Sequence, residues 1–166
     1  RIDLFNPYCY ILHGSFEPIF DCDREAKIQA LIKSLNELKG FTNNFVCVEN
    51  LPRTCLLNTT TEINDVLSYC DGIYLCIDSN HFLREKSEDA LLKVDGSKIK
   101  TLHISDHNYV QEKHWLPGEG EINWMKFIAN LERIGYQGVF NYEVNHPFET
   151  VRENFVELFQ KYNMIK

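Results

Sequence analysis

The sequence lacks several features that would each indicate a particular class of protein. It has no apolar run long enough to span a membrane and no signal-peptide pattern at its start. It has no cluster of Lys and Arg, and its net charge is −7, so composition does not support nucleic-acid binding. Linkers and low-complexity tracts are also missing. We therefore expect one globular domain over residues 1–166, with no membrane partner and with nucleic acid as a disfavoured partner.

Paired cysteine motifs are missing as well. The chain has six cysteines, but none of them forms a C-x-x-C pair. Cys9, Cys47 and Cys76 lie inside apolar runs, where a free thiol behaves as a small hydrophobic side chain. We expect reduced thiols and a cytoplasmic protein, with a disulfide framework as the less favoured alternative.

What the sequence does contain is a repeated pattern of apolar segments that end in a residue able to bind a metal. The segments are YCYILH (ending at His13), FVCVE (Glu49), GIYLCID (Asp78), IKTLHI (with His103 next to last) and GVFNYE (Glu143). Parallel strands are buried on both faces and read as near-continuous apolar runs. In a barrel their carboxyl ends meet at one rim, where the chemistry lies. The pattern therefore predicts both a fold and the position of a site.

Helical stripes of apolar residues separate these segments. The spacing predicts helices over residues 28–38, 63–70, 87–96, 124–135 and 151–162, the last containing Tyr162. Alternating strands and helices predict an α/β protein with right-handed crossovers. An open doubly wound sheet also alternates, but it concentrates its site at one switch point, so ligand-type residues at every strand end favour the barrel.

Five strands cannot close a barrel that needs eight. The chain begins at Arg1 without an initiator Met, and its first apolar run already has the character of an interior strand. We therefore expect about the last five βα units of a (β/α)8 TIM barrel. The exposed strand edges and inner faces of such a piece would favour self-association, so a homo-oligomer is an open expectation.

The strongest candidate site combines Glu49, Asp78, His103 and Glu143. Three carboxylates and one imidazole suit one divalent ion such as Mn²⁺, Mg²⁺, Co²⁺ or Zn²⁺. Each residue alone is more often a helix cap, a loop charge or a structural histidine. Four of them at corresponding strand ends favour a metal site, because a cation would relieve the repulsion between crowded carboxylates.

Residues beside these ends extend the candidate site. His81 follows Asp78 by three residues, within reach of a substrate or a second metal. Asp106 follows His103 by three, and we expect it to accept an imidazole N–H of a site histidine. Gly118 and Gly120 bracket Glu119 in a turn that either approaches a ligand or simply connects two elements.

The strings VENLP, IDSNH, LHISDH, HWLPGEGEINW and NYEV resemble the xylose isomerase-like TIM barrel superfamily. That group includes sugar phosphate isomerases and epimerases and the endonuclease IV type of apurinic-site nuclease. The resemblance runs from about Tyr8 to the end of the chain. It implies a metal site at Glu49, Asp78, His103 and Glu143. It also implies that His81 contacts substrate, as in the epimerases, or metal, as in the nuclease.

The resemblance extends to two further places. His13 falls where the family has a strand-end His, although the Pro that follows there is absent. Glu112 and His114 fall where the nuclease type has an Asp-x-His pair that completes a three-zinc cluster, and the Asp is here a Glu. We take His13, His81, His114 and Glu119 as candidate substrate-binding residues.

The function expected from these residues is metal-dependent isomerisation or epimerisation of a sugar or sugar phosphate. Glu49 and Glu143 would remove and return a proton at carbon, while the ion polarises the carbonyl and stabilises an enediolate. An endonuclease IV-like phosphodiesterase that cleaves abasic DNA with several Zn²⁺ ions is the alternative. The third hypothesis is that the protein is a non-catalytic relative of these enzymes.

Overall fold

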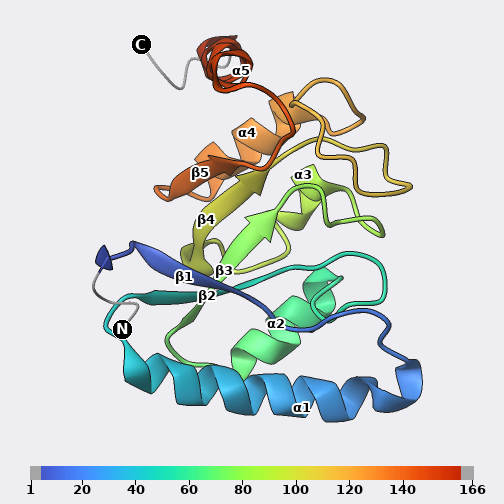
Figure 1. Ribbon diagram of the computed structural model, residues 1–166, viewed down its shortest axis with the longest axis vertical. Coiled ribbons are helices and arrows are strands. Elements are labelled where there is room, and N and C mark those ends of the chain that lie inside the picture. The colour runs from blue at the N-terminus through green and yellow to red at the C-terminus, as the bar shows by residue number, and fades with distance from the viewer. Residues whose placement is uncertain (1–4, 162–166) are drawn as a thin grey trace.

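A computed structural model describes residues 5–161, and they form a half barrel (Figure 1). The sheet has five parallel strands in the order β1-β2-β3-β4-β5. The strands are β1 (Cys9–His13), β2 (Phe45–Glu49), β3 (Ile73–Asp78), β4 (Ile99–Ile104) and β5 (Val139–Tyr142). The helices are α1 (Asp21–Leu38), α2 (Thr60–Ser68), α3 (Ser87–Ala90), α4 (Trp124–Arg133) and α5 (Phe148–Lys161), with short 3₁₀ turns η2 (Lys39–Phe41) and η3 (Gly96–Lys98). The predicted partial barrel is confirmed.

The prediction that every strand is buried on both faces is correct for the centre and wrong for the edges. Nearly every residue of β2, β3 and β4 is buried. In β1 residues 9–12 are only half-buried and His13 is exposed, and in β5 Val139 and Asn141 are exposed. Within residues 5–161 each edge strand has a neighbour on one side only, so part of its surface stays open to solvent.

The apolar core lies between the outer faces of the strands and the helices. Leu35 of α1, Ile63 of α2 and Phe127 of α4 are among its fully buried side chains. Two helices, α2 and α4, begin at side-chain caps: Thr59 accepts a hydrogen bond from the backbone N–H of Glu62, and Asn123 accepts one from that of Lys126. The packing of the helices against the sheet and the capping of their first turns therefore hold the carboxyl ends of the strands in place.

The predicted helix over 87–96 is wrong in length. The α-helix α3 is a single turn, and the backbone N–H groups of Leu92 and Lys93 then bond three residues back, which keeps this segment in tight turns up to η3. α5 begins at Phe148, earlier than predicted, and Tyr162 lies outside the described residues.

A register shift between β3 and β4 places two of the candidate ligands side by side. Leu75 pairs with Ile99, but the next residue, Cys76, pairs with Thr101, so Lys100 is an extra residue in β4. After the shift Asp78 pairs with His103. Because side chains alternate between faces, this one extra residue turns His103 to the same inner face as Asp78.

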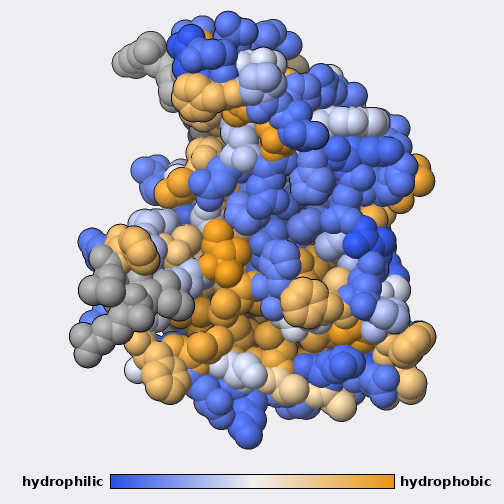
Figure 2. All heavy atoms as spheres, viewed as in Figure 1, coloured by the Kyte–Doolittle hydropathy of each residue, from blue (hydrophilic) through white to orange (hydrophobic). Residues whose placement is uncertain are grey.

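The surface differs between the two ends of the molecule (Figure 2). Apolar side chains gather over the lower part of the view, where β1, β2 and α1 lie, and the exposed aromatic side chains of Tyr8, Phe16, Phe20 and Phe41 belong to this end. The upper right of the view is mostly hydrophilic. None of the helices in residues 5–161 combines the length and apolar character needed to cross a membrane.

Candidate metal centre and active site

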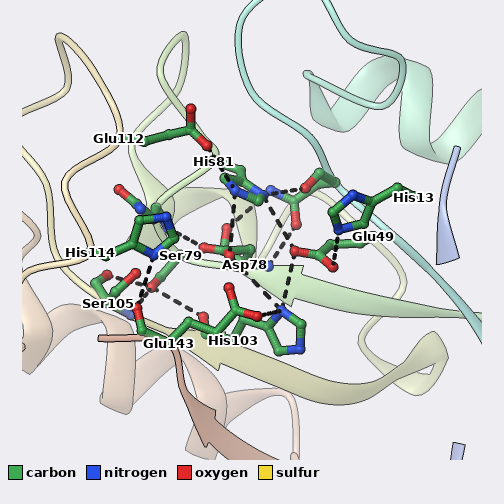
Figure 3. Close-up of polar contacts among 12 residues, drawn as sticks. His13, Glu49, Asp78, Ser79, His81, His103, Ser105, Glu112, His114 and Glu143 are labelled. Atoms are coloured by element: carbon green, nitrogen blue, oxygen red, sulfur yellow. Dashed lines mark hydrogen bonds and ion pairs between the residues drawn. The ribbon is translucent and has the colours of Figure 1, made fainter. Parts of the chain in front are cut away.

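The structure brings the four predicted ligands together at the carboxyl ends of the strands (Figure 3). Each of Glu49, Asp78, His103 and Glu143 offers a ligand atom, and these atoms lie within 4.8 Å of one another. His103 is central: its Nδ1 lies 3.2 Å from Glu49 Oε1 and 3.2 Å from Glu143 Oε1. The donor set of carboxylate oxygens and one imidazole nitrogen fits a divalent ion.

The four side chains differ in exposure. Glu49 and Asp78 are completely buried and His103 nearly so, whereas the side chain of Glu143 is 41% exposed. Glu143 follows β5, an edge strand, and its backbone N–H is held by the carbonyl of Ile104. The cluster therefore has a fixed inner part and one outer carboxylate that reaches solvent.

The electrostatics of Asp78 favour a bound cation. Burial, together with the charge of Glu49, raises the pKa of the Asp78 carboxyl well above its ordinary value. Its Oδ1 accepts the backbone N–H of Asn80 at 2.6 Å, but among the described residues no donor bonds to Oδ2. A buried carboxylate oxygen without a donor is costly, and a divalent ion at this point would satisfy it.

Glu49 and His103 form a charge-coupled pair. Burial opposes ionisation of both, but their hydrogen bond lowers the pKa of the Glu49 carboxyl and raises the pKa of the His103 imidazole. The charge of Glu143 adds to the effect on His103. Without an ion, the imidazole thus takes the place of a cation between two carboxylates.

Asn50 holds the β3 ligand in place, and the sequence analysis did not identify it. Its side-chain Nδ2 donates to the carbonyl of Asp78 at 3.0 Å and its Oδ1 accepts the N–H of Asp78 at 2.7 Å. Its own carbonyl lies 2.8 Å from His81 Nδ1, so this nitrogen carries the proton. Asn50 is completely buried directly after Glu49, and this position was the only signal in the sequence.

His81 lies beside the four-residue cluster. Its Nδ1 is 3.4 Å from Glu49 Oε1, and its Nε2 is 3.5 Å from Asp78 Oδ2 and 3.2 Å from Glu112 Oε1. Burial lowers the pKa of the His81 imidazole to about 4, so the ring is neutral near pH 7. The neutral ring presents an unprotonated Nε2 at the edge of the site.

Arg53 is a second residue that the sequence analysis did not identify. Its guanidinium pairs with Glu17 at 2.6 Å, and it also pairs with Glu112. It thereby joins the β1–α1, β2–α2 and β4–α4 loops. Because the Glu112 carboxylate already has a cationic partner, this pairing does not favour a further zinc at His81, Glu112 and His114. In residues 5–161 these three side chains do not come close enough together to form a group of potential metal ligands.

The remaining candidates lie around the rim. His13 Nε2 is 3.2 Å from Glu49 Oε2, and the His13 side chain is 53% exposed. His114 Nδ1 donates to the backbone carbonyl of Glu143 at 2.9 Å, while the Glu143 carboxylate points away toward His103 (Figure 3). Glu119 lies farther out: its Oε2 accepts the N–H of Leu116 and is 3.7 Å from His146.

Asp106 does not accept a hydrogen bond from the imidazole of a site histidine, contrary to the prediction. Its carboxylate organises the loop before α4. The donors are the backbone N–H groups of His107, Gly118, Gly120 and Ile122 and the indole N–H of Trp124, at 2.8–3.2 Å. A Cβ at Gly120 would lie 2.4 Å from Asp106 Oδ1, which explains the glycine.

Comparison with known proteins by sequence also indicates a TIM barrel. The family model described as a xylose isomerase-like TIM barrel matches residues 4–160. An uncharacterized protein of Methanocaldococcus jannaschii is 28% identical over 127 residues, covering 75% of this chain and 50% of the relative. An inosose isomerase of Bacillus licheniformis is 29% identical over 128 residues, covering 65% of this chain and 46% of the relative. The chain thus spans about half the length of these curated relatives.

Solved structures share the fold. A D-tagatose 3-epimerase-like protein superposes with a TM-score of 0.81 at 19% identity, covering 95% of this chain and 64% of that chain. The IOLI protein with a bound zinc atom superposes with a TM-score of 0.73 at 21% identity, covering 93% of this chain and 63% of that chain. At these identities the likeness establishes the architecture of the half barrel.

Proposed function

Because the chain belongs to the xylose isomerase-like TIM barrel family, we propose that it acts as a divalent-metal-dependent isomerase or epimerase of a sugar or sugar phosphate. The observation that carries the proposal is the cluster of Glu49, Asp78, His103 and Glu143, in which a buried inner set meets one solvent-exposed carboxylate. The names of relatives agree in kind, since they include an inosose isomerase and a D-tagatose 3-epimerase-like protein.

The four residues of the cluster would hold one ion, and Mn²⁺, Mg²⁺, Co²⁺ and Zn²⁺ all suit the donor set. A bound divalent ion supplies Lewis-acid polarisation of a substrate carbonyl. The fit is supported by Asp78, which is completely buried and lacks a donor to Oδ2 among the described residues. Asn50 would keep Asp78 in position through its paired hydrogen bonds.

Two carboxylates would move the proton. Glu143 and Glu49 approach His103 from different strands, each with Oε1 3.2 Å from its Nδ1. Glu143 is open to solvent and would remove a proton from the carbon next to the carbonyl, which gives an enediolate. Glu49 would return a proton on its side of the substrate, and the position of its return decides between isomerisation and epimerisation.

Histidines around the rim would bind the substrate. His81 is neutral with an unprotonated Nε2, which suits acceptance of a hydrogen bond from a hydroxyl group. His114 and the exposed His13 border Glu143 and Glu49 respectively. Glu119 would act farther out. These groups favour a small polyhydroxylated carbonyl compound, and residues 1–166 would contribute them as the C-terminal part of a barrel.

The abasic-site nuclease remains the alternative proposal, with less support. It requires ligands for several zinc ions, and the Arg53–Glu112 pair occupies the carboxylate that such a cluster would use. A non-catalytic relative is the third candidate. The orphaned buried carboxylate oxygen of Asp78 weighs against it, because a protein without a metal has no evident reason to retain it.

The test has two parts, metal content and carbon–hydrogen exchange. The protein would be dialysed extensively and analysed for metal ions per chain, and then assayed for incorporation of solvent deuterium into inosose and ketoses. We expect about one ion and exchange at the carbon next to the carbonyl. Two or three zinc ions with cleavage of an abasic duplex would instead establish the nuclease. Absence of both activities in a metal-loaded protein would favour the non-catalytic relative.

A further inference from the structure

A buried thiol lies directly beneath the candidate metal centre. Cys76 is on β3, two residues before Asp78, so both side chains point to the inner face of the half barrel. In the β2–β3 register Cys76 pairs with Glu49, another cluster residue. The Cys76 sulfur, a Glu49 oxygen and a His103 nitrogen lie within 4.8 Å of one another. The thiol can therefore share one ion with Glu49 and His103.

We propose that Cys76 is a metal ligand, which together with Glu49 and His103 forms a deeper, sulfur-containing position for thiophilic divalent ions such as Zn²⁺, Co²⁺ and Cd²⁺. This position shares two ligands with the proposed catalytic site, and the inference therefore rests on the proposed function. Mg²⁺ and Mn²⁺ prefer oxygen and would use the outer set with Asp78 and Glu143. The choice between the two positions would make the site selective by metal softness.

The three ligands of the deeper position match the charge of a divalent ion, and the buried Asp78 carboxylate lies beside both positions. One thiolate and one carboxylate balance the two positive charges of the ion, and His103 contributes a neutral nitrogen. The outer set contains three carboxylates and leaves a surplus negative charge. Glu49 and Cys76 are completely buried, where a surplus charge is costly, whereas Glu143 is exposed and can turn to solvent.

Two buried carboxylate oxygens of the cluster support a cation near this position. Glu49 Oε2 and Asp78 Oδ2 form no hydrogen bond among residues 5–161, although His13 Nε2 lies 3.2 Å from Glu49 Oε2. When the metal–sulfur bond forms, the S–H bond breaks and the proton passes to solvent.

Cys47 provides a matched control within the chain. It is also completely buried, and it lies two residues before Glu49 on the neighbouring strand β2. It belongs to neither group of potential ligands in the described part of the chain. In the β2–β3 register Cys47 is level with Tyr74, so removal of its thiol perturbs the adjacent layer of the barrel interior without touching the proposed coordination.

The test is cobalt absorption spectroscopy of the protein, with Co²⁺ itself as the probe. A cobalt–thiolate bond gives an intense near-ultraviolet charge-transfer band, and the weaker visible bands report any bound cobalt. We expect the charge-transfer band in the wild type and in Cys47→Ala, and its loss in Cys76→Ser and Cys76→Ala. The preference for Cd²⁺ over Mn²⁺ in competition titrations should fall at least about tenfold in both Cys76 variants.

The outcomes separate this inference from the proposed function. Visible cobalt bands without a charge-transfer band in the wild type would overturn the role of Cys76 and leave the outer metal site intact. The same holds if the band persists in Cys76→Ser, whose near-isosteric side chain preserves the packing. Failure of every ion to bind would overturn both the inference and the metal dependence of the proposed function.

Discussion

The central strands and the edge strands of this half barrel contribute differently to the same site. β2, β3 and β4 supply Glu49, Asp78 and His103, all from buried positions. The edge strand β5 leads to Glu143, which is 41% exposed. Buried ligands are fixed by packing, whereas an exposed carboxylate can change its position as a substrate arrives. The difference agrees with the proposed function, in which the buried residues hold the ion and the exposed Glu143, also a ligand, removes the proton.

Replacement of the edge carboxylate gives the largest expected effect. Glu143→Gln should reduce solvent-exchange turnover by about a thousandfold, because an amide cannot remove the proton from carbon. The exposed position should leave the circular dichroism spectrum and the unfolding curve unchanged. Glu132→Gln on the exposed side of α4 is the matched control and should keep full activity. Turnover of Glu143→Gln within about tenfold of wild type would remove this residue from the mechanism.

Weakening the loop between β4 and α4, which Asp106 organises, should lower the free energy of unfolding without weakening metal binding. In Asp106→Asn, one oxygen of the carboxylate becomes an N–H donor that faces the donors it formerly accepted from, at Gly118, Gly120 or Trp124. We expect a loss of about 3 kcal/mol in the free energy of unfolding by urea, with metal affinity changed far less. Asn108→Ala on the same loop should cost under about 1 kcal/mol, since its hydrogen bonds are exposed. Equal losses would show that Asp106 has no special role.

Replacement in the centre should separate metal binding from stability. Asp78→Asn keeps the shape and the bond to Asn80 but removes a buried negative charge. We expect metal affinity to fall about a hundredfold by titration calorimetry. The metal-free variant should unfold at a higher urea concentration than the metal-free wild type, because the repulsion from Glu49 that raises the pKa of Asp78 is relieved. A lower urea midpoint would contradict this account of the centre.

Acid should weaken the metal-free protein through its buried imidazoles. Burial lowers the pKa of His107 from 6.5 to about 4, so the unfolded chain takes up a proton first as the pH falls. This contribution is fully present above pH 6.5 and is lost between pH 6.5 and 4, reaching about 2 kcal/mol at pH 5. His81 adds a loss of the same sign. In His107→Gln the fall in unfolding free energy from pH 7 to pH 5, measured by urea titration at each pH, should shrink by about that amount.

The sequence was sufficient for the order of elements and for the four clustered side chains, because strand ends can be identified from local apolar runs. It did not indicate which strands are edges, since β5 has the same apolar pattern as a central strand. Asn50 and Arg53 were missed because their partners are distant along the chain: Asn50 bonds to Asp78, and Arg53 pairs with Glu112. The role of Asp106 depends on the path of a loop, which no local periodicity reveals.

The extra residue in β4 has a consequence for how the chain tolerates insertions and deletions. Lys100 sets the alternation of faces, so deleting it, or inserting one residue between Thr101 and His103, would turn His103 toward the helices while Asp78 stayed in place. The β4–α4 loop, by contrast, can change length on the solvent side without altering that alternation. In a library of single-residue deletions, the short segment of β4 before His103 should therefore be the least permissive part of the rim.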